Sequence, residues 1–282
     1  MKLCRYGASG EERPGMVDAD GRIRDLSAHV ADIDAAVLAG GIDALRALDL
    51  GSLPTVAGHP RYGVPIAGTR KFIAIGLNYA DHAAESNLPI PDEPVVFNKW
   101  VNCLQGANDP VVIPPGSTKT DWEVELGVVI GRGGHQIGEA DALGHVAGYA
   151  CINDVSERNW QQERGPTWDK GKGFPTFGPV GPWLVTPDEV GDPQALAMWL
   201  DVNGKRMQHG STATMIFTVA QIVAYCSRFM ALEPGDIITT GTPPGVGLGQ
   251  KPSPLYLKPG DVVTLGIDRL GSQRQEFVAF PG

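Results

Sequence analysis

Short apolar runs rich in Val, Ile and Thr recur along most of the chain, and clusters of Gly and Pro separate them. Runs of this kind predict strands, and the separators predict turns. Helical patterns are few, so strands and helices do not alternate as a doubly wound sheet requires. The pattern therefore predicts a β-rich α+β fold. The expected strands are Phe72–Gly76, Val111–Ile113, Val124–Ile130, Ala147–Ile152, Trp183–Val185, Ala197–Val202, Asp236–Thr240 and Val262–Ile267, and the expected helices are Ala80–Ser86, Val155–Arg164 and Thr218–Phe229.

The first 65 residues have a different pattern. A strand-like piece at Gly21–Leu26 precedes an Ala- and Leu-rich helical segment at Ile33–Leu48. Gly and Pro then punctuate Gly51–Pro65, as is typical of a connection. We expect residues 1–65 to form a small N-terminal α/β domain and residues 66–282 to form the larger β-rich domain.

Two glutamates interrupt the most apolar of the predicted strands. Glu123 and Glu125 stand two apart, so in an extended chain both carboxylates project from one face. Paired like charges beside an apolar wall repel each other and lose hydration, and a bound divalent cation reverses that cost. A half-buried strand with a solvated outer face explains the pair equally well. Other residues have to decide between the two.

A third carboxylate, Asp154, follows the predicted strand at Ala147–Ile152. Asp154 with Glu157 three residues later also matches a helix N-cap and its reciprocal partner, and taken alone that interpretation is the better one. With Glu123 and Glu125, however, Asp154 completes a set of three oxygen ligands. Such a set suits Mg²⁺ or Mn²⁺ better than zinc.

His82 and Glu85 are three residues apart in a predicted helix, where such residues share a face. A carboxylate beside an imidazole orients the ring and raises its basicity, as a general base requires. A solvated helix face is the commoner explanation of an isolated pair.

Two glycine-containing segments are further candidates. In Lys170–Gly173, small residues would let a lysine approach a ligand, although a surface turn explains the segment too. The loop Thr239–Gly247 offers hydroxyls and backbone N–H groups to an anion, although a tight connection has the same composition. The chain contains neither a Gly-x-Ser-x-Gly elbow nor a His-Glu-x-x-His helix, which argues against serine hydrolases and zinc proteases.

Composition limits the partners. A net charge of −9 without a basic run argues against nucleic acid. No apolar stretch approaches the roughly 20 residues of a membrane span, and the N-terminus lacks a signal-peptide core, so we expect a cytoplasmic protein. The four cysteines are scattered, as is typical of reduced thiols.

Five blocks, in order, resemble the signature of the fumarylacetoacetate hydrolase family from about Lys71 onward. They are Gly76–His82, Asp121–Leu126, Asn153–Ser156, Gly171–Lys172 and Thr240–Pro243. The resemblance implies a mixed β-sandwich roll as the catalytic domain, usually in a homodimer. It implies Mg²⁺ or Mn²⁺ bound by Glu123, Glu125 and Asp154, with His82 and Glu85 on a lid where they activate water.

The same resemblance implies roles for further residues. Lys172, Arg158 and Gln161 match positions that face the substrate, and Thr240, Gly241 and Thr242 lie in the loop that receives its carboxylate. The whole chain is most similar to bacterial members that hydrolyse 2,4-diketo-3-deoxy-L-rhamnonate or L-fuconate. In one departure, Gly173 follows Lys172 where many members have serine, which bears on the shape of the pocket.

These observations lead to one hypothesis about function and three alternatives. The hypothesis is metal-dependent hydrolysis of a carbon–carbon bond in a small 2,4-dioxo acid, which gives pyruvate and a second acid such as lactate. Lys172 would neutralise developing negative charge. Oxaloacetate decarboxylation and a hydratase, isomerase or lyase reaction could use the same site. A non-catalytic protein that binds a metal or an oxo acid is the third alternative.

Overall fold

The computed structural model describes residues 1–81 and 89–282. Its largest sheet has 11 strands, with the main path β3-β2-β1-β13-β10-β9-β16-β4-β5 and with β12 and β6 attached beside β10. These strands are β1 (Lys2–Tyr6), β2 (Arg13–Val17), β3 (Ile23–Asp25), β4 (Phe72–Gly76), β5 (Val95–Lys99), β6 (Leu104–Gly106), β9 (Val124–Ile130), β10 (Val146–Asn153), β12 (Gly178–Val180), β13 (Leu184–Val185) and β16 (Ile237–Thr239).

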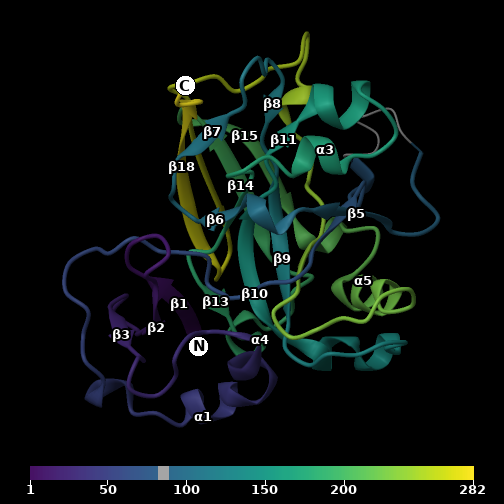
Figure 1. Cartoon of the computed structure of the whole chain (residues 1–282). Helices are drawn as coiled ribbons and strands as arrows, with labels where there is room; N and C mark the ends of the chain where they lie inside the picture. Colours follow the sequence, from purple (N-terminus) through teal and green to yellow (C-terminus); the bar gives the residue numbers. More distant parts are fainter. Residues whose placement is uncertain (82–88) are drawn as a thin grey trace.

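A second sheet has five strands in the order β15-β14-β17-β18-β7. It packs on β9 and β10 through β14, β17 and β18, so β9 and β10 lie in the middle of the molecule (Figure 1). All residues of β9 and β10 are buried. The strands of this sheet are β7 (Val111–Ile113), β14 (Ala197–Val202), β15 (Lys205–Ser211), β17 (Val262–Ile267) and β18 (Gly271–Ala279), and a separate pair is formed by β8 (Thr120–Asp121) and β11 (Ser156–Glu157).

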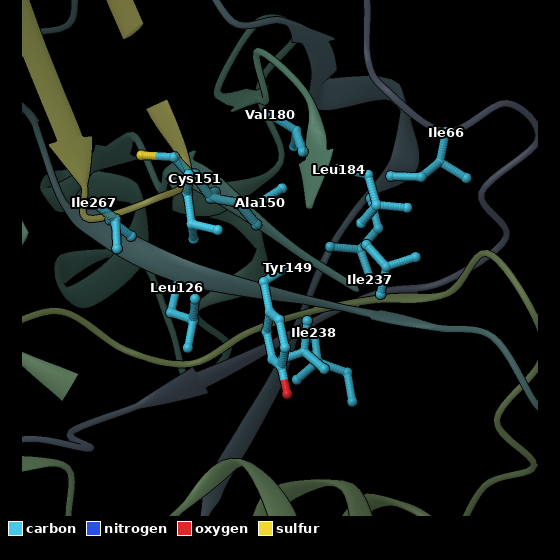
Figure 2. Packing of buried hydrophobic residues seen from close by; sticks show 14 of the residues in the cluster. Ile66, Leu126, Tyr149, Ala150, Cys151, Val180, Leu184, Ile237, Ile238 and Ile267 are labelled. Carbon is cyan, nitrogen blue, oxygen red and sulfur yellow. The ribbon is translucent and has the colours of Figure 1, made fainter. Parts of the chain in front are cut away.

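The main core surrounds these central strands. Figure 2 shows part of it, where Tyr149 of β10 lies near Ile238 of β16. Short helices cover the edges, and only α5 reaches eight residues among those described. Their bounds are η1 (Val37–Gly41), α1 (Ile42–Arg46), η2 (Leu50–Ser52), η3 (Val101–Cys103), η4 (Glu139–His145), η5 (Asn159–Glu163), α3 (Asp169–Lys172), α4 (Pro187–Val190), η6 (Thr212–Thr214), α5 (Val219–Cys226) and η7 (Gly247–Gly249).

The β-rich fold class predicted from the sequence is confirmed. All eight predicted strands are present, with ends that differ by at most two residues. The helix predicted at Val155–Arg164 is present only in its second part, because the chain first forms β11 and then the π-helix η5. Ser156 and Glu157 pair with β8, and this pairing overrides the local helical pattern.

The N-terminal region, purple in Figure 1, contributes β1, β2 and β3 to the large sheet. Strand β1 pairs with β13 through Lys2 and Leu3, which joins this region to the rest of the sheet. A domain boundary at residue 65 stays a prediction, as do the homodimer and the cytoplasmic location. No helix in the described ranges is long and apolar enough to cross a membrane.

Candidate metal centre and substrate pocket

The structure brings the three predicted carboxylates together. Glu125 lies in β9, Glu123 directly precedes that strand, and Asp154 directly follows β10. The two strands are antiparallel neighbours, with Val124 opposite Asn153, and the Asp154 N–H donates to the Glu123 carbonyl at 2.9 Å. Strand pairing therefore places Asp154 beside the glutamates, although it is some 30 residues away in sequence.

The donor set fits a divalent cation. One oxygen from each of Glu123, Glu125 and Asp154 lies within 4.8 Å of the others, and all three residues are buried. Three carboxylate oxygens without nitrogen or sulfur are typical of Mg²⁺ and Mn²⁺ sites. The geometry disfavours the solvated-face explanation of the two glutamates, because each is at most 5% exposed.

The Glu125 carboxylate is held by the last residue of β16 and by the loop that follows it. The Thr239 hydroxyl and the Gly241 N–H both donate to its Oε2, at 2.5 and 2.8 Å. The glycine- and threonine-rich loop thus binds an anion, as its composition suggested, but that anion is the protein's own glutamate. Burial and the nearby charges of Asp154 and Glu123 raise the pKa of Glu125 well above its usual value.

Two buried cations neutralise Glu123. Lys172 Nζ lies between the ligands, donating to Glu123 Oε2 at 2.5 Å and to Asp154 Oδ2 at 2.8 Å. Arg158 Nη2 donates to Glu123 Oε1 at 2.7 Å. Burial works against both cations. For Lys172 the charges of Asp154 and Glu123 outweigh burial and raise its pKa, and for Arg158 those of Asp121 and Glu123 do the same.

Lys99, at the end of β5, is a third buried cation and was missed by the sequence reasoning. Its Nζ lies 2.7 Å from Asp154 Oδ1 and donates to the Lys172 carbonyl at 2.6 Å. The contact with Asp154 is ionic, because the direction does not suit a hydrogen bond and Oδ1 has no hydrogen-bond partner among the described residues. A charged residue at the end of the apolar run Val95–Lys99 was the available signal.

Asp121 is the second residue that the sequence reasoning missed. Its Oδ2 accepts from Arg158 Nε and from the Leu248 N–H, and its Oδ1 accepts from the Gly247 N–H. One fully buried carboxylate therefore fixes both the arginine and the start of η7 at the edge of the pocket. Asp121 immediately precedes the Trp122–Glu125 pattern, so proximity in sequence was its only signal.

Lys172 reaches the carboxylates from the last position of α3, and its neighbour Gly171 allows the approach. A Cβ on Gly171 would lie 2.5 Å from the Gln161 nitrogen, so a larger residue would separate α3 from η5. The surface-turn explanation of this segment is wrong, since Lys172 is only 2% exposed. The N-cap interpretation of Asp154 is wrong too, because η5 begins after Arg158, and Glu157 instead accepts from Ser117 and Trp160.

A cavity of about 630 Å³ opens beside the carboxylates. Among the residues predicted to face the substrate, it is lined by Arg158, Gln161, Lys172, Gly241 and Thr242. Thr240 is not part of the lining, and its hydroxyl donates to the Leu126 carbonyl. His82 and Glu85 lie outside the described residues.

Thr242 lines the cavity, but its hydroxyl is already engaged. It donates to the Val124 carbonyl at 2.9 Å and accepts from Gln208 Nε2 at 2.8 Å. Because its single proton is used, the hydroxyl cannot also donate to a substrate carboxylate. Its visible role is to fix the loop against β9.

The fold is therefore a roll of two packed sheets that carries three buried carboxylates at one end of its central strands. Residues 71–278 match the family described as fumarylacetoacetate (FAA) hydrolase C-terminal. The chain belongs to this family, as the sequence motifs predicted.

Similar proteins cover the whole chain. A protein described as a putative hydrolase in Burkholderia multivorans is 63% identical over 276 residues, which is 98% of each chain. The solved fumarylacetoacetate hydrolase of Exiguobacterium antarcticum is 35% identical with a TM-score of 0.89, over 99% of this chain and 100% of that one.

A third similar protein was solved with ligands. It is maleylpyruvate hydrolase from Sphingobium sp. SYK-6 in complex with manganese(II) and pyruvate, which is 29% identical with a TM-score of 0.83 over 100% of both chains. This chain is therefore an enzyme of the fumarylacetoacetate hydrolase family.

Proposed function

We propose that this protein hydrolyses a carbon–carbon bond in a 2,4-dioxo acid of the acylpyruvate type, with Mg²⁺ or Mn²⁺ bound by Glu123, Glu125 and Asp154. The substrate we favour is 2,4-diketo-3-deoxy-L-rhamnonate or L-fuconate, and the products are pyruvate and a second acid such as lactate. The observation that carries the proposal is the set of three buried carboxylates within 4.8 Å of one another at a cavity. The manganese and pyruvate in the related maleylpyruvate hydrolase support it.

Bond cleavage requires water to add to the C4 carbonyl and the C3–C4 bond to break, leaving its electron pair on C3, which then takes a proton. When bound, a divalent cation supplies Lewis-acid stabilisation of the negative charge that develops at the 2-oxo acid end. Lys172 Nζ lies between Glu123 and Asp154, so its ammonium stands where it can neutralise part of that charge. Arg158 and Gln161 are joined at 2.9 Å and hold the adjacent wall.

His82 and Glu85 are assigned to water activation in this proposal. The support is their spacing in sequence and the position of the chain just before them, since Gly76 and Leu77 line the cavity. His82, oriented by Glu85, would take the proton from the attacking water.

The direct test is a pyruvate-release assay with 2,4-diketo-3-deoxy-L-rhamnonate and L-fuconate, with Mg²⁺ or Mn²⁺ and an EDTA control. We expect pyruvate only when metal is present. If no pyruvate forms but oxaloacetate yields CO₂ under the same conditions, the decarboxylase alternative replaces the hydrolase.

A second test separates water activation from binding. We expect His82→Ala to retain Mn²⁺ affinity and to lose about 10²- to 10⁴-fold in kcat, the usual contribution of a general base. Full activity in His82→Ala would remove this residue from the mechanism. Oxaloacetate decarboxylation needs no attacking water, so it should survive the substitution better than hydrolysis.

A further inference from the structure

The lining of the cavity combines two kinds of side chain. Glu123, Asp154, Arg158 and Lys172 are charged. Ile75, Leu77, Phe97, Trp168 and Leu248 contribute apolar surface to the same cavity. The proposed chemistry uses only the charged residues, so the aromatic surface formed by Phe97 and Trp168 is without a role in it.

Ring contacts connect the aromatic surface to the carboxylates. Lys172 Nζ, which binds Glu123 and Asp154, lies 5.4 Å from the centroid of the Phe97 ring. The Phe97 and Trp168 rings are 5.3 Å apart and meet edge to face at 66°. Phe97 therefore contacts both Lys172 and Trp168 and connects the Trp168 indole to the carboxylate end of the cavity.

The Trp168 indole has little freedom to move toward β4. A Cβ on Gly76, the last residue of β4, would lie 2.4 Å from the indole Cζ3, so the ring rests directly on the glycine backbone. The next residue, Asp169, accepts the Asn98 N–H at 2.9 Å and ties the start of α3 to β5. A ring held in this way forms a fixed boundary of the cavity.

We infer that Trp168 is a specificity-determining residue that limits the acyl group of the substrate to a short one with an apolar end. This inference rests on the proposed function, because it takes the 2-oxo acid end to lie at the carboxylates. The acyl group then extends past Phe97 and meets the Trp168 indole. In this arrangement a group of lactoyl size, which ends in a methyl, would contact the indole, and a longer chain that extends in the same direction would collide with it.

The test compares acetylpyruvate with hexanoylpyruvate as substrates of the Mn²⁺-loaded protein. We expect Trp168→Ala to raise the ratio of kcat/KM for the long substrate over the short one by at least about tenfold, since each accommodated methylene in an apolar pocket is worth about that factor. Trp168→Phe, which removes only part of the ring system, should give an intermediate ratio. If Trp168→Ala does not fold, the substrate ratio of Trp168→Phe alone tests the inference.

Trp100 provides the matched control. Its indole also rests on a glycine, because a Cβ on Gly173 would lie 2.6 Å from Trp100 Cε3. Gly173 directly follows α3, but Trp100 does not line the cavity beside the carboxylates. Trp100→Ala should leave the substrate ratio unchanged. An unchanged ratio in both Trp168 variants, or an equal rise in Trp100→Ala, would overturn the inference.

A binding measurement distinguishes failure of this inference from failure of the proposed function. Calorimetric titration of the Mn²⁺-loaded variants with pyruvate and 2-oxohexanoate measures the affinity for a short and a longer 2-oxo acid. It therefore tests whether Trp168 limits chain length without requiring turnover. We expect Trp168→Ala to leave pyruvate affinity within about twofold and to improve 2-oxohexanoate affinity about tenfold. If the unmodified protein releases pyruvate neither from these acylpyruvates nor from the two deoxy sugar acids, the proposed reaction is wrong, and the titration alone then decides the role of Trp168.

Discussion

Two clusters in this protein both pair carboxylates with cations, but they differ in how deeply their side chains are buried. The outer cluster, defined as Arg5, Glu12, Asp32, Arg61 and Asp109, joins the N-terminal strands to the loop after β6. Its side chains are between 10% and 27% exposed. Arg5 and Arg61 each make a two-pronged contact with a carboxylate, which is the favourable geometry for such pairs.

The inner cluster at the cavity has four carboxylates and three cations, all at most 5% exposed. Its members are Lys99, Asp121, Glu123, Glu125, Asp154, Arg158 and Lys172. Burial makes each unbalanced charge costly, and the carboxylates are in excess.

The two clusters shift carboxyl pKa values in opposite directions. Burial works against the Glu12 carboxylate, but the hydrogen bond from Arg61 and the charges of both arginines outweigh it and lower the pKa of Glu12. For Glu125, burial is reinforced by Asp154 and Glu123, and the pKa is raised. The outer carboxylate is stabilised as an anion by its partners. The inner one is strained as an anion, which a bound divalent cation would relieve.

The largest expected effect comes from removing one cation from each cluster. We predict that Lys99→Met lowers the free energy of unfolding by about 3 kcal/mol, because Asp154 loses a buried counter-charge and the Lys172 carbonyl loses its donor. Arg5→Met in the outer cluster should cost about 1 kcal/mol, since its partners can be solvated. Urea denaturation of the two variants measures the difference. Equal losses would mean that depth of burial does not distinguish the clusters.

The second prediction concerns metal affinity and uses the same substitution in both clusters. Glu123→Gln should weaken Mn²⁺ binding by about 100-fold or more, because it removes a charged ligand oxygen. Glu12→Gln should leave Mn²⁺ binding unchanged. Isothermal titration of each purified variant provides the measurement, with circular dichroism to verify folding. Retained affinity in Glu123→Gln would exclude that residue as a ligand.

These clusters also show what sequence can predict. Period-two alternation placed Glu123 and Glu125 on one face of a strand, but a solvated outer face explained the pair equally well, and only the structure shows that both are buried. The strands were predicted well, since β9, β10 and β17 are short apolar runs between turns. Asp154 required the ordered motifs, because local pattern alone favoured a helix cap.

Lys99 and Asp121 could not be found in that way. Their functions depend on pairings between distant segments, namely Lys99 with Asp154 and Asp121 with the loop at Gly247. The same limit explains the wrong start of the helix predicted at Val155–Arg164, where Ser156 and Glu157 pair with β8 instead. Local sequence pattern predicts on which face of a strand or helix a side chain lies, but not which distant segment packs against that face.

The smallest predicted effect is a difference in how the stability of the fold depends on pH, measured on metal-free protein in EDTA. A carboxyl whose folded-state pKa is raised stabilises the fold fully below its unfolded pKa, and that contribution is lost as pH rises through the folded pKa. For Glu125 we therefore expect Glu125→Gln to gain stability over the unmodified protein at alkaline pH, with the difference shrinking toward acid. Glutamine can still accept from Thr239 and Gly241, so the test isolates the charge.

Glu12→Gln should show the opposite trend, because the lowered pKa of Glu12 contributes stability above its unfolded pKa that is lost as pH falls through the folded value. Glu12→Gln should thus be less stable than the unmodified protein at neutral pH, and this difference in stability should decrease as the pH is lowered. Thermal denaturation midpoints from pH 4 to 9 would give two difference curves with opposite sign. Curves of the same sign would mean that the inner carboxylates are already balanced by Lys99, Arg158 and Lys172, and that metal binding relieves no strain there.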